Sequence, residues 1–163
     1  MKTLYHGGDN IINTPEIREP IRTLDFGKGF YLTSSKQQAI DWVYRRLDNR
    51  NISQGYINTY DFDESLAKKF LKIKRFEKAD EAWVDFVMKN RRIIEFEHDY
   101  DIVIGPVAND KVYTAFALYE GGTISKDILI QELKTYRLVD QYLFHTNESL
   151  KYLRFKEAKE ITL

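Results

Sequence analysis

A histidine, a tyrosine and a group of glycines stand at spacings that can bring them to the mouth of one cleft. His6 is followed by Gly7 and Gly8, which leave the backbone open just past the end of a short apolar stretch. Residues 24–33 read LDFGKGFYLT, and the glycines on each side of Lys28 make a flexible turn that is rich in N–H donors. The apolar run after this turn predicts a strand with one buried face.

Strand alternation decides which of these side chains share a face. Leu4 and His6 lie on one face of the first strand, and Tyr31 and Thr33 lie on one face of the second. The glycines after His6 keep the end of the first strand open. We therefore expect His6 and Tyr31 to meet at the mouth of one cleft.

The two stretches together resemble the ADP-ribosyltransferase fold of the His-Tyr-Glu type, the class that includes diphtheria toxin and the poly(ADP-ribose) polymerases. In that class a first strand ends Tyr-His-Gly, a second carries Gly-Lys-Gly followed by Phe or Ile and then Tyr, and a glutamate opens a later strand. Here the first two signatures match at His6, Gly7 and Tyr31. The third position falls on Gln141, in the stretch of residues 140–146 that reads DQYLFHT.

The chain as a whole is similar to a bacterial group of ADP-ribosyltransferase-like proteins, some of which are toxins paired with small antitoxins. The resemblance extends over most of the length, through residues 83–86, residues 101–110 and the strand of Gln141. It implies a mono-ADP-ribosyltransferase that uses NAD as co-substrate and modifies an intracellular protein or nucleic acid. A toxin role, with a cognate antitoxin as partner, is implied on the same ground alone.

The resemblance also implies a role for each signature residue. The backbone of Gly7 binds the nicotinamide carboxamide, the His6 side chain hydrogen-bonds to ribose, and Tyr31 stacks on the cationic nicotinamide ring. Lys28 is a candidate to approach the NAD phosphates, with a solvated turn as the alternative. The reaction breaks the bond between nicotinamide and ribose through an oxocarbenium-like state, and it calls for no metal.

Gln141 departs from the glutamate of the class. A glutamine keeps the hydrogen bond to the ribose 2′-hydroxyl but lacks the negative charge, and losing one preorganised electrostatic group commonly costs about 3 kcal/mol of barrier. Three outcomes stay open: an enzyme that is slower or that transfers single units, the use of another carboxylate such as Glu132 or Asp110, or a non-catalytic relic of an NAD site. Gln141 also has a plain structural interpretation, as a hydrogen-bonding residue in a sheet.

Composition predicts one folded domain over residues 1–163. The hydrophobic fraction of 43% supports a core without disulfides, and the 25 basic and 25 acidic residues leave no net charge. Non-specific nucleic-acid binding through global charge is therefore not implied. The absence of cysteine removes cysteine nucleophiles and Cys-based zinc sites. Neither an apolar leader nor a membrane-length apolar run occurs, so we expect a cytoplasmic protein.

Mixed strands and helices without strict alternation predict an α+β domain, and the resemblance specifies a split, mainly antiparallel sheet with peripheral helices around an NAD cleft. The expected helices begin at Ser35, cover residues 79–90, follow the cap Asn109 and follow the cap Ser125. Beyond the two signature strands, the expected strands are residues 55–63, 70–76, 100–107, 141–145 and 153–155. Residues 10–23 and 48–55 are expected to be loops, the first of them bordering the nucleotide site.

Several other residues have mainly structural interpretations. Trp42 and Trp83 are expected in the core, because each lies on the apolar stripe of a helix. His98 lies among acidic residues without a second histidine nearby, so we expect an exposed loop rather than a metal site. Residues 68–92 hold nine bases and four acids and are expected to be a solvated face, with substrate binding as the alternative.

The alternatives to a transferase follow from what the sequence lacks. It has no G-x-G-x-x-G after a strand, no P-loop and no nucleophile elbow, so redox chemistry with NAD(P) and Ser-His-Asp hydrolysis are unsupported. An NAD glycohydrolase, with water as the acceptor, is the closest alternative. A non-catalytic module that binds a nucleotide or a protein on the same fold is the second.

Overall fold

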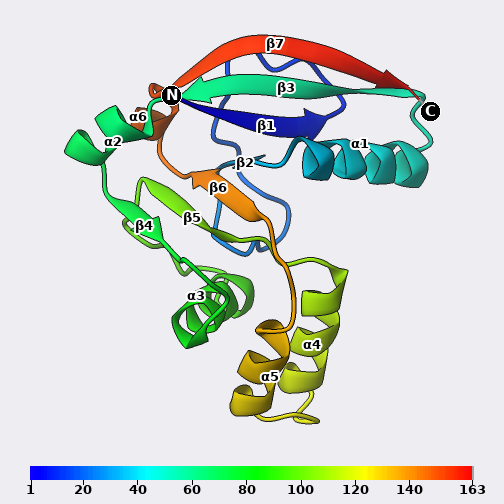
Figure 1. Ribbon diagram of the computed structural model, residues 1–163, viewed down its shortest axis with the longest axis vertical. Helices are drawn as coiled ribbons and strands as arrows, with labels where there is room; N and C mark the ends of the chain where they lie inside the picture. Colours follow the sequence, from blue (N-terminus) through cyan, green and yellow to red (C-terminus); the bar gives the residue numbers. More distant parts are fainter. Residues whose placement is uncertain (163) are drawn as a thin grey trace.

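The structure, a computed structural model, describes residues 1–162 and has an α+β architecture, as the sequence predicts (Figure 1). Within these residues the strands are β1 (Lys2–Gly8), β2 (Phe30–Thr33), β3 (Gln54–Phe62), β4 (Ile73–Arg75), β5 (Ile102–Pro106), β6 (Asp140–Phe144) and β7 (Leu153–Thr162). The helices are α1 (Lys36–Arg50), α2 (Glu64–Phe70), α3 (Glu81–Arg92), α4 (Asp110–Glu120), α5 (Lys126–Leu133) and α6 (Asn147–Leu150). Neighbouring strands are antiparallel except β4 and β5, so the prediction of a mainly antiparallel sheet is confirmed.

The sheet is continuous, in the order β4-β5-β6-β2-β1-β3-β7, but its central joint is narrow. β1 pairs with β3 from Lys2 to Gly8, whereas it pairs with β2 through Tyr5 and Thr33. β2 in turn pairs over its full length with β6. The structure thus has a short ladder between β1 and β2 where the resemblance implies a split. Residues 6–8 of β1 therefore extend past the end of the ladder with β2.

The two faces of the sheet carry separate cores. The cluster on one face contains Leu4, Phe30, Leu32, Tyr60, Phe62, Ala67, Ile102, Ile104, Tyr142 and Phe144. The other face carries two clusters, one under α1 and one under α3, α4 and α5. Tyr31 packs against the second of these, which confirms that it alternates with Phe30 and Leu32. β2 therefore passes between α1 and the group α3 to α5.

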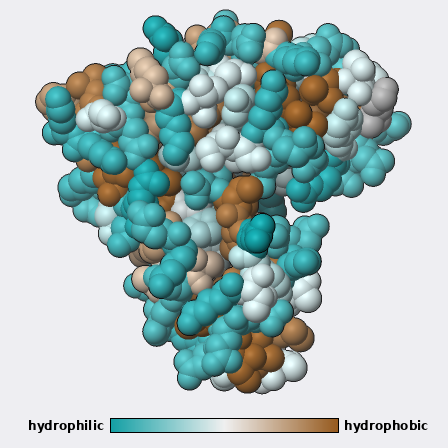
Figure 2. All heavy atoms as spheres, viewed as in Figure 1, coloured by the Kyte–Doolittle hydropathy of each residue, from teal (hydrophilic) through white to brown (hydrophobic). Residues whose placement is uncertain are grey.

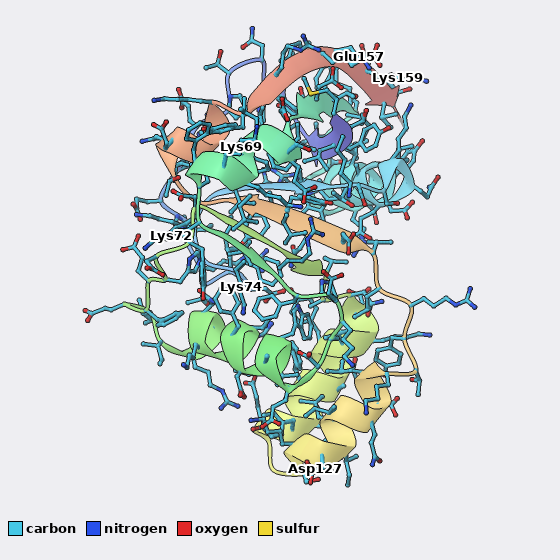
Figure 3. The ribbon with its side chains drawn as sticks, turned by 60° about the vertical axis from the view of Figure 1, so that its left-hand side comes forward. Lys69, Lys72, Lys74, Asp127, Glu157 and Lys159 are labelled. Carbon is cyan, nitrogen blue, oxygen red and sulfur yellow. The ribbon has the colours of Figure 1, made fainter. Side chains whose placement is uncertain are left out.

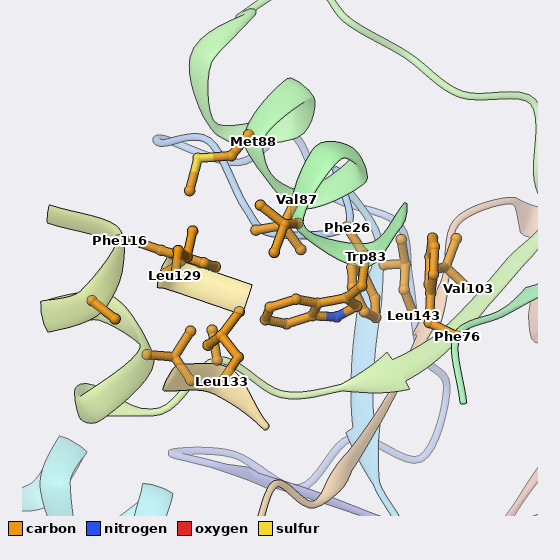
Figure 4. Close-up of a cluster of buried hydrophobic side chains, with 14 residues drawn as sticks. Phe26, Phe76, Trp83, Val87, Met88, Val103, Phe116, Leu129, Leu133 and Leu143 are labelled. Carbon is orange, nitrogen blue, oxygen red and sulfur yellow. The ribbon is translucent and has the colours of Figure 1, made fainter. Parts of the chain in front are cut away.

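Trp83 lies at the centre of the largest cluster, which Figure 4 shows in close-up. Its ring is fully buried, and its indole N–H donates a hydrogen bond to the Pro106 carbonyl oxygen at 3.1 Å. The core position predicted for Trp83 is confirmed, and truncating such a side chain usually costs about 3–5 kcal/mol. Phe26, from the loop before β2, packs into the same cluster. The glycine-rich turn that follows it is therefore anchored to the core.

The structure corrects the prediction for the segment after β3. Residues 64–70 form α2, because Asp63 caps a helix there by accepting a hydrogen bond from the Leu66 N–H at 3.0 Å. The strand expected over residues 70–76 consequently shrinks to β4. Apolar and basic residues do alternate in this segment, but they form the end of a helix and a short edge strand.

α1 also differs from its predicted form. The helix continues to Arg50, and Asn51 ends it with a left-handed φ of 52°, so the expected loop over residues 48–55 begins later. Trp42 is 40% exposed, and the prediction that it belongs to the core is wrong. The face of α1 that packs on the sheet carries Ala39, Val43 and Leu47, and it turns Trp42 away from the sheet.

The predicted helix caps are confirmed. Ser35, Asn109 and Ser125 each accept a hydrogen bond from the N–H three residues later, at 3.2, 3.1 and 3.2 Å. A side-chain cap of this kind typically stabilises a helix by about 1 kcal/mol. Asn109 is thus explained by its cap, as the sequence indicates.

The basic segment lies on the surface. Lys69 of α2, Lys72 of the connection and Lys74 of β4 follow one another (Figure 3), and the Lys72 ammonium pairs with Asp99 at 2.9 Å. Figure 2 shows hydrophilic residues over most of the visible face, with hydrophobic residues in separate patches. Among residues 1–162, no helix is both long enough and apolar enough to cross a membrane.

Gly29 is required by a close approach between β2 and β6. Its φ is +150°, and a Cβ atom there would overlap the Phe144 carbonyl oxygen and the Leu143 side chain. We expect Gly29→Ala to lower the free energy of unfolding by about 3 kcal/mol or more, since strain adds to a clash with backbone. Gly122→Ala is the control, because its φ is +77° but nothing lies within 4 Å of the new Cβ. Urea unfolding should show that Gly122→Ala lowers the free energy of unfolding by about 1 kcal/mol. Equal losses of this free energy in the two variants would contradict the close approach between β2 and β6.

Candidate functional site

Three of the polar and aromatic side chains singled out by the sequence lie on one face at the centre of the sheet. Thr33 of β2 is the direct partner of Gln141 on β6, and Tyr31 lies two residues away from Thr33 on the same face. Diagonal neighbours such as Tyr31 and Gln141 are typically about 7–8 Å apart. On either side of this face stand α1 and α4, linked by Arg45 and Asp110 at 3.9 Å. We call Tyr31, Thr33, Gln141, Trp42, Arg45 and Asp110 the interhelical site.

Gln141 is buried without a full set of partners. It is 8% exposed, between Thr33 and Gly105 of the neighbouring strands, and within residues 1–162 its side-chain Nε2 has no hydrogen-bond partner. A buried donor left unpaired costs about 1–3 kcal/mol. Such a group in a native protein calls for an explanation, and a ligand atom that accepts a hydrogen bond is one.

Tyr31 is fixed by its hydroxyl group. The hydroxyl donates to the Gly27 carbonyl oxygen at 2.5 Å and accepts from the Phe26 N–H at 3.1 Å. Burial of this group raises the pKa of Tyr31 well above its usual value, and the nearby Asp25 carboxylate adds to the rise. The phenol therefore stays neutral, and the ring is held against the helical cluster with its orientation set by the turn.

The three carbonyl oxygens of residues 26–28 each accept a hydrogen bond from a side chain. His98 Nε2 bonds to Phe26 O at 2.7 Å, the Tyr31 hydroxyl to Gly27 O, and His145 Nδ1 to Lys28 O at 2.6 Å. We call this segment the tethered turn. The prediction that His98 lies in an exposed loop is wrong, because its ring is only 9% exposed and lies 4.2 Å from the ring of His145. The acidic neighbours of His98 in the sequence project outward instead.

His6 lies at the end of the short β1–β2 ladder. Its Nδ1 donates to the Tyr31 carbonyl oxygen at 2.8 Å, and its ring stacks on Phe30 at 4.6 Å. The His6 side chain thus makes a hydrogen bond to β2 where the backbone ladder would otherwise continue. Burial lowers the pKa of His6 and the nearby Arg46 lowers it further, against the opposing effect of the bond to Tyr31. The neutral ring therefore has a donor at Nδ1 and an acceptor at Nε2, which points past Gly8.

The structure brings His6 and Tyr31 into contact, but not on one face. Phe30, on which His6 stacks, belongs to the core on the opposite side of the sheet from Tyr31. The two residues meet through the Tyr31 backbone at the strand ends. A glycine is required at position 7 for packing alone, because a Cβ atom there would overlap the Ala39 carbonyl oxygen of α1. A ligand held by all three residues must therefore lie at the end of the β1–β2 ladder.

The remaining predicted residues lie around this centre. The Lys28 ammonium is 3.0 Å from Glu19 and 3.8 Å from Glu97, so a phosphate would have to compete with two carboxylates for it. Asp110 is exposed at the start of α4, on one wall of the interhelical site. Glu132 of α5 accepts a hydrogen bond from Tyr136, four residues later in the chain. α5 lies at the far end of the molecule from β1 in Figure 1.

Trp42 is a site residue that the sequence analysis missed. The Arg45 guanidinium lies 5.8 Å from the centre of the Trp42 ring, and the same guanidinium reaches Asp110 on α4. Trp42 is therefore on the side of α1 that faces α4, where it is 40% exposed. An exposed indole is a surface on which a flat ring can stack. The available signal was the i, i+3 spacing of Trp42 from the buried Ala39, which also suits a core residue.

Asp25 is the second missed residue. Its carboxylate is 11% exposed, accepts a hydrogen bond from the Tyr113 hydroxyl at 2.9 Å and lies 3.4 Å from Arg91. Burial raises the pKa of Asp25, while Tyr113 and Arg91 hold it down. Asp25 immediately precedes Phe26, whose N–H bonds to the Tyr31 hydroxyl. A buried carboxylate thus stands at the hydroxyl end of Tyr31.

The fold and these residues define the class of protein: an α+β domain with an open sheet whose central strands hold a histidine, a tyrosine and a buried glutamine with an unpaired amide. The chain belongs to the family described as Protein of unknown function (DUF3990), whose model matches residues 2–155. No curated protein matches the chain. The matched range includes the whole interhelical site and the tethered turn.

His98 predicts a specific dependence of stability on pH. Its Nδ1 accepts from the Tyr100 N–H at 3.2 Å, so protonation there would break this bond, and burial with the nearby His145 lowers its pKa below the ordinary 6.5. Between the lowered and the ordinary pKa the unfolded chain binds more protons than the folded one. The free energy of unfolding should therefore be fully retained above about pH 6.5 and fall as the solution is acidified.

Urea unfolding at pH 7.5 and pH 5.0 measures this dependence. His98→Gln keeps an N–H donor for Phe26 but cannot titrate, so the loss of stability on acidification should be smaller than in the wild type. It should not vanish, because the pKa of His6 is lowered as well. An unchanged loss in His98→Gln would show that His98 does not titrate on unfolding in this range.

Proposed function

We propose that the protein is a NAD-dependent mono-ADP-ribosyltransferase, which transfers one ADP-ribose unit to an intracellular macromolecule and releases nicotinamide. The observation that carries the proposal is the unpaired, buried amide of Gln141 on the strand beside Tyr31. A ribose hydroxyl supplies the acceptor atom that this amide lacks. The His6-Gly7 and Gly-Lys-Gly-Phe-Tyr signatures, on adjoining strands, support the same ligand.

Nicotinamide would lie between two aromatic rings. Tyr31 offers its ring from the sheet, and Trp42 offers an exposed indole from the wall on α1. A flat, cationic ring is attracted to such faces both by stacking and by the negative face of the π-system. The carboxamide would bond to the backbone of Gly7 past the end of the β1–β2 ladder. His6 Nε2, an acceptor in the neutral ring, would take a proton-donating ribose hydroxyl.

The transfer itself requires negative charge near the ribose. As the bond between the ribose C1′ and the nicotinamide nitrogen breaks, the electron pair leaves with nicotinamide and positive charge builds up on the sugar. The acceptor atom then bonds to C1′ and gives up its proton. Gln141 orients a hydroxyl but supplies no charge. Asp25, buried at the hydroxyl end of Tyr31, is the carboxylate that we assign to this task.

The stacking role of Trp42 gives the first test of NAD binding. Trp42→Ala should weaken NAD binding about tenfold or more, since stacking on an aromatic side chain is worth about 1–3 kcal/mol per base. The side chain is exposed, so the variant should unfold at the same temperature as the wild type. Isothermal titration with NAD gives the affinity, and thermal unfolding checks the fold.

Tyr44→Ala is the matched control for that variant. Tyr44 is an aromatic residue of the same helix with 42% exposure, but it does not share the side of α1 that carries Trp42 and Arg45. It should bind NAD as the wild type does. Equal weakening in the two variants, or none in either, would remove the stacked nicotinamide from the proposal.

The charge requirement predicts opposite effects for two substitutions. Asp25→Asn should slow nicotinamide release by roughly 30–160-fold, as expected for the loss of about 2–3 kcal/mol of electrostatic stabilisation. Gln141→Glu should increase release by roughly tenfold, because it adds the charge of the His-Tyr-Glu class. Chromatographic measurement of nicotinamide released from NAD follows both.

Asp110→Asn is the control for these variants, since Asp110 is an exposed carboxylate on the opposite wall. It should leave release unchanged. If Asp110→Asn stops release and Asp25→Asn does not, the charge comes from α4 and the assignment of Asp25 is wrong. Release of nicotinamide without labelling of any macromolecule would make the protein a glycohydrolase, and binding without release would make it a binding module.

A further inference from the structure

A pocket of about 430 Å³ lies beside the tethered turn, apart from the interhelical site. It is bounded by the loop before β2, by the end of α3 with the segment that follows it, and by the residue after β6. The residues that matter for its chemistry are Gly27, Lys28, Asn90, Glu97, His98 and His145. Gln141, Tyr31 and Trp42 are not among the residues that line it.

Asn90 presents an unpaired acceptor to this pocket. The residue is 4% exposed, and its side-chain Nδ2 donates to the Phe86 carbonyl oxygen at 2.8 Å. Within residues 1–162 its Oδ1 is buried and has no partner, and it lies 3.1 Å from the point where Gly27 would carry a Cβ. An amide oxygen in this state needs an N–H or O–H donor. Gly27 lacks the side chain that would otherwise lie against this oxygen.

A carboxylate acceptor lies close by. His145 Nδ1 donates to Lys28 O at 2.6 Å, and His145 Nε2 lies 3.5 Å from the Glu97 carboxylate. The His98 ring, 4.2 Å from that of His145, connects this pair to the position of Asn90 beside Gly27. The buried amide oxygen of Asn90 and the Glu97 carboxylate thus belong to residues that line one pocket.

The charges around the pocket disfavour an anion as its ligand. Glu19, Glu95 and Glu97 line it with Arg22 and Lys28, so the acids outnumber the bases by one. The Lys28 ammonium is already paired with Glu19 and Glu97. A phosphate or a carboxylate would meet acceptor atoms and a carboxylate. A cation with several N–H groups would satisfy them.

We propose that this pocket binds a guanidinium group. A guanidinium is planar, always charged and carries N–H donors in a fork, so it can bond to Asn90 Oδ1 and the Glu97 carboxylate together. Phe96, which also lines the pocket, gives it an apolar wall. Resting on the proposed transferase function, the pocket is where an arginine side chain of the acceptor docks.

The test is the binding of agmatine in the absence of NAD, measured by isothermal titration on the intact protein. N-carbamoylputrescine is the matched ligand control, because it replaces the guanidinium with a neutral ureido group of the same shape. Agmatine should bind at least tenfold more tightly than N-carbamoylputrescine. Equal binding of the two compounds, or no binding of agmatine, overturns the proposal.

Variants locate the binding. Glu97→Gln, at a side chain that is 63% exposed, should weaken agmatine binding about tenfold without loss of fold, and Asn90→Leu should weaken it at least as much. Glu16→Gln, on the same loop as Glu19 but outside the pocket, should have no effect. Agmatine binding that is insensitive to Glu97→Gln overturns the assignment even if Asn90→Leu fails to fold.

The same measurements separate this proposal from the proposed function. Trp42→Ala should weaken NAD binding and leave agmatine binding intact. If agmatine binds as predicted but NAD neither binds nor turns over, the guanidinium site stands and the transferase function falls. If NAD turns over but agmatine does not bind, the transferase stands and arginine is excluded as the group that docks here.

Discussion

The hydrogen bonds that hold the carbonyl oxygens of residues 26–28 are the interactions on which the rest of the site depends. Gly27 and Gly29 both have positive φ, so this segment cannot continue the ladder of β2 and its carbonyls need other partners. Tyr31, His98 and His145 supply them from three different parts of the chain. The turn is thereby fixed in one conformation. Its position determines where the Tyr31 ring lies and closes one side of the neighbouring pocket.

The joint between β1 and β2 is the second constraint. Antiparallel strands gain most of their stability from continuous ladders, yet here the ladder stops after Tyr5 and Thr33 and His6 bonds to the Tyr31 carbonyl instead. The cost of a short ladder is offset by the long pairing of β1 with β3 and of β2 with β6. What remains is backbone past the ladder end, at the centre of a sheet and beside a neutral histidine.

The sequence predicted those features that depend on near neighbours. The caps at Ser35 and Asn109 and the alternation along β2 follow from residues within a few positions of each other, and the structure has them. Burial that arises between distant segments could not be predicted. Asp25 is enclosed by Arg91 and Tyr113, 66 and 88 positions away, and nothing in the residues next to Asp25 signals this. The misplacement of His98 has the same cause, because its partner Phe26 is 72 positions away.

The two candidate sites have opposite hydrogen-bonding character, and this difference follows from single atoms. At the interhelical site, within residues 1–162, Gln141 offers an unpaired donor, which suits the hydroxyl oxygen of a sugar. In the pocket beside the tethered turn Asn90 offers an unpaired acceptor, next to Glu97 and His145, which suits a cation with N–H groups. A transferase needs its donor and acceptor substrates on two sides of one reacting carbon, recognised by different chemistry. Under the proposed function, NAD would occupy the interhelical site and an arginine would occupy the pocket beside the tethered turn, so each substrate would be recognised by groups of the opposite hydrogen-bonding character.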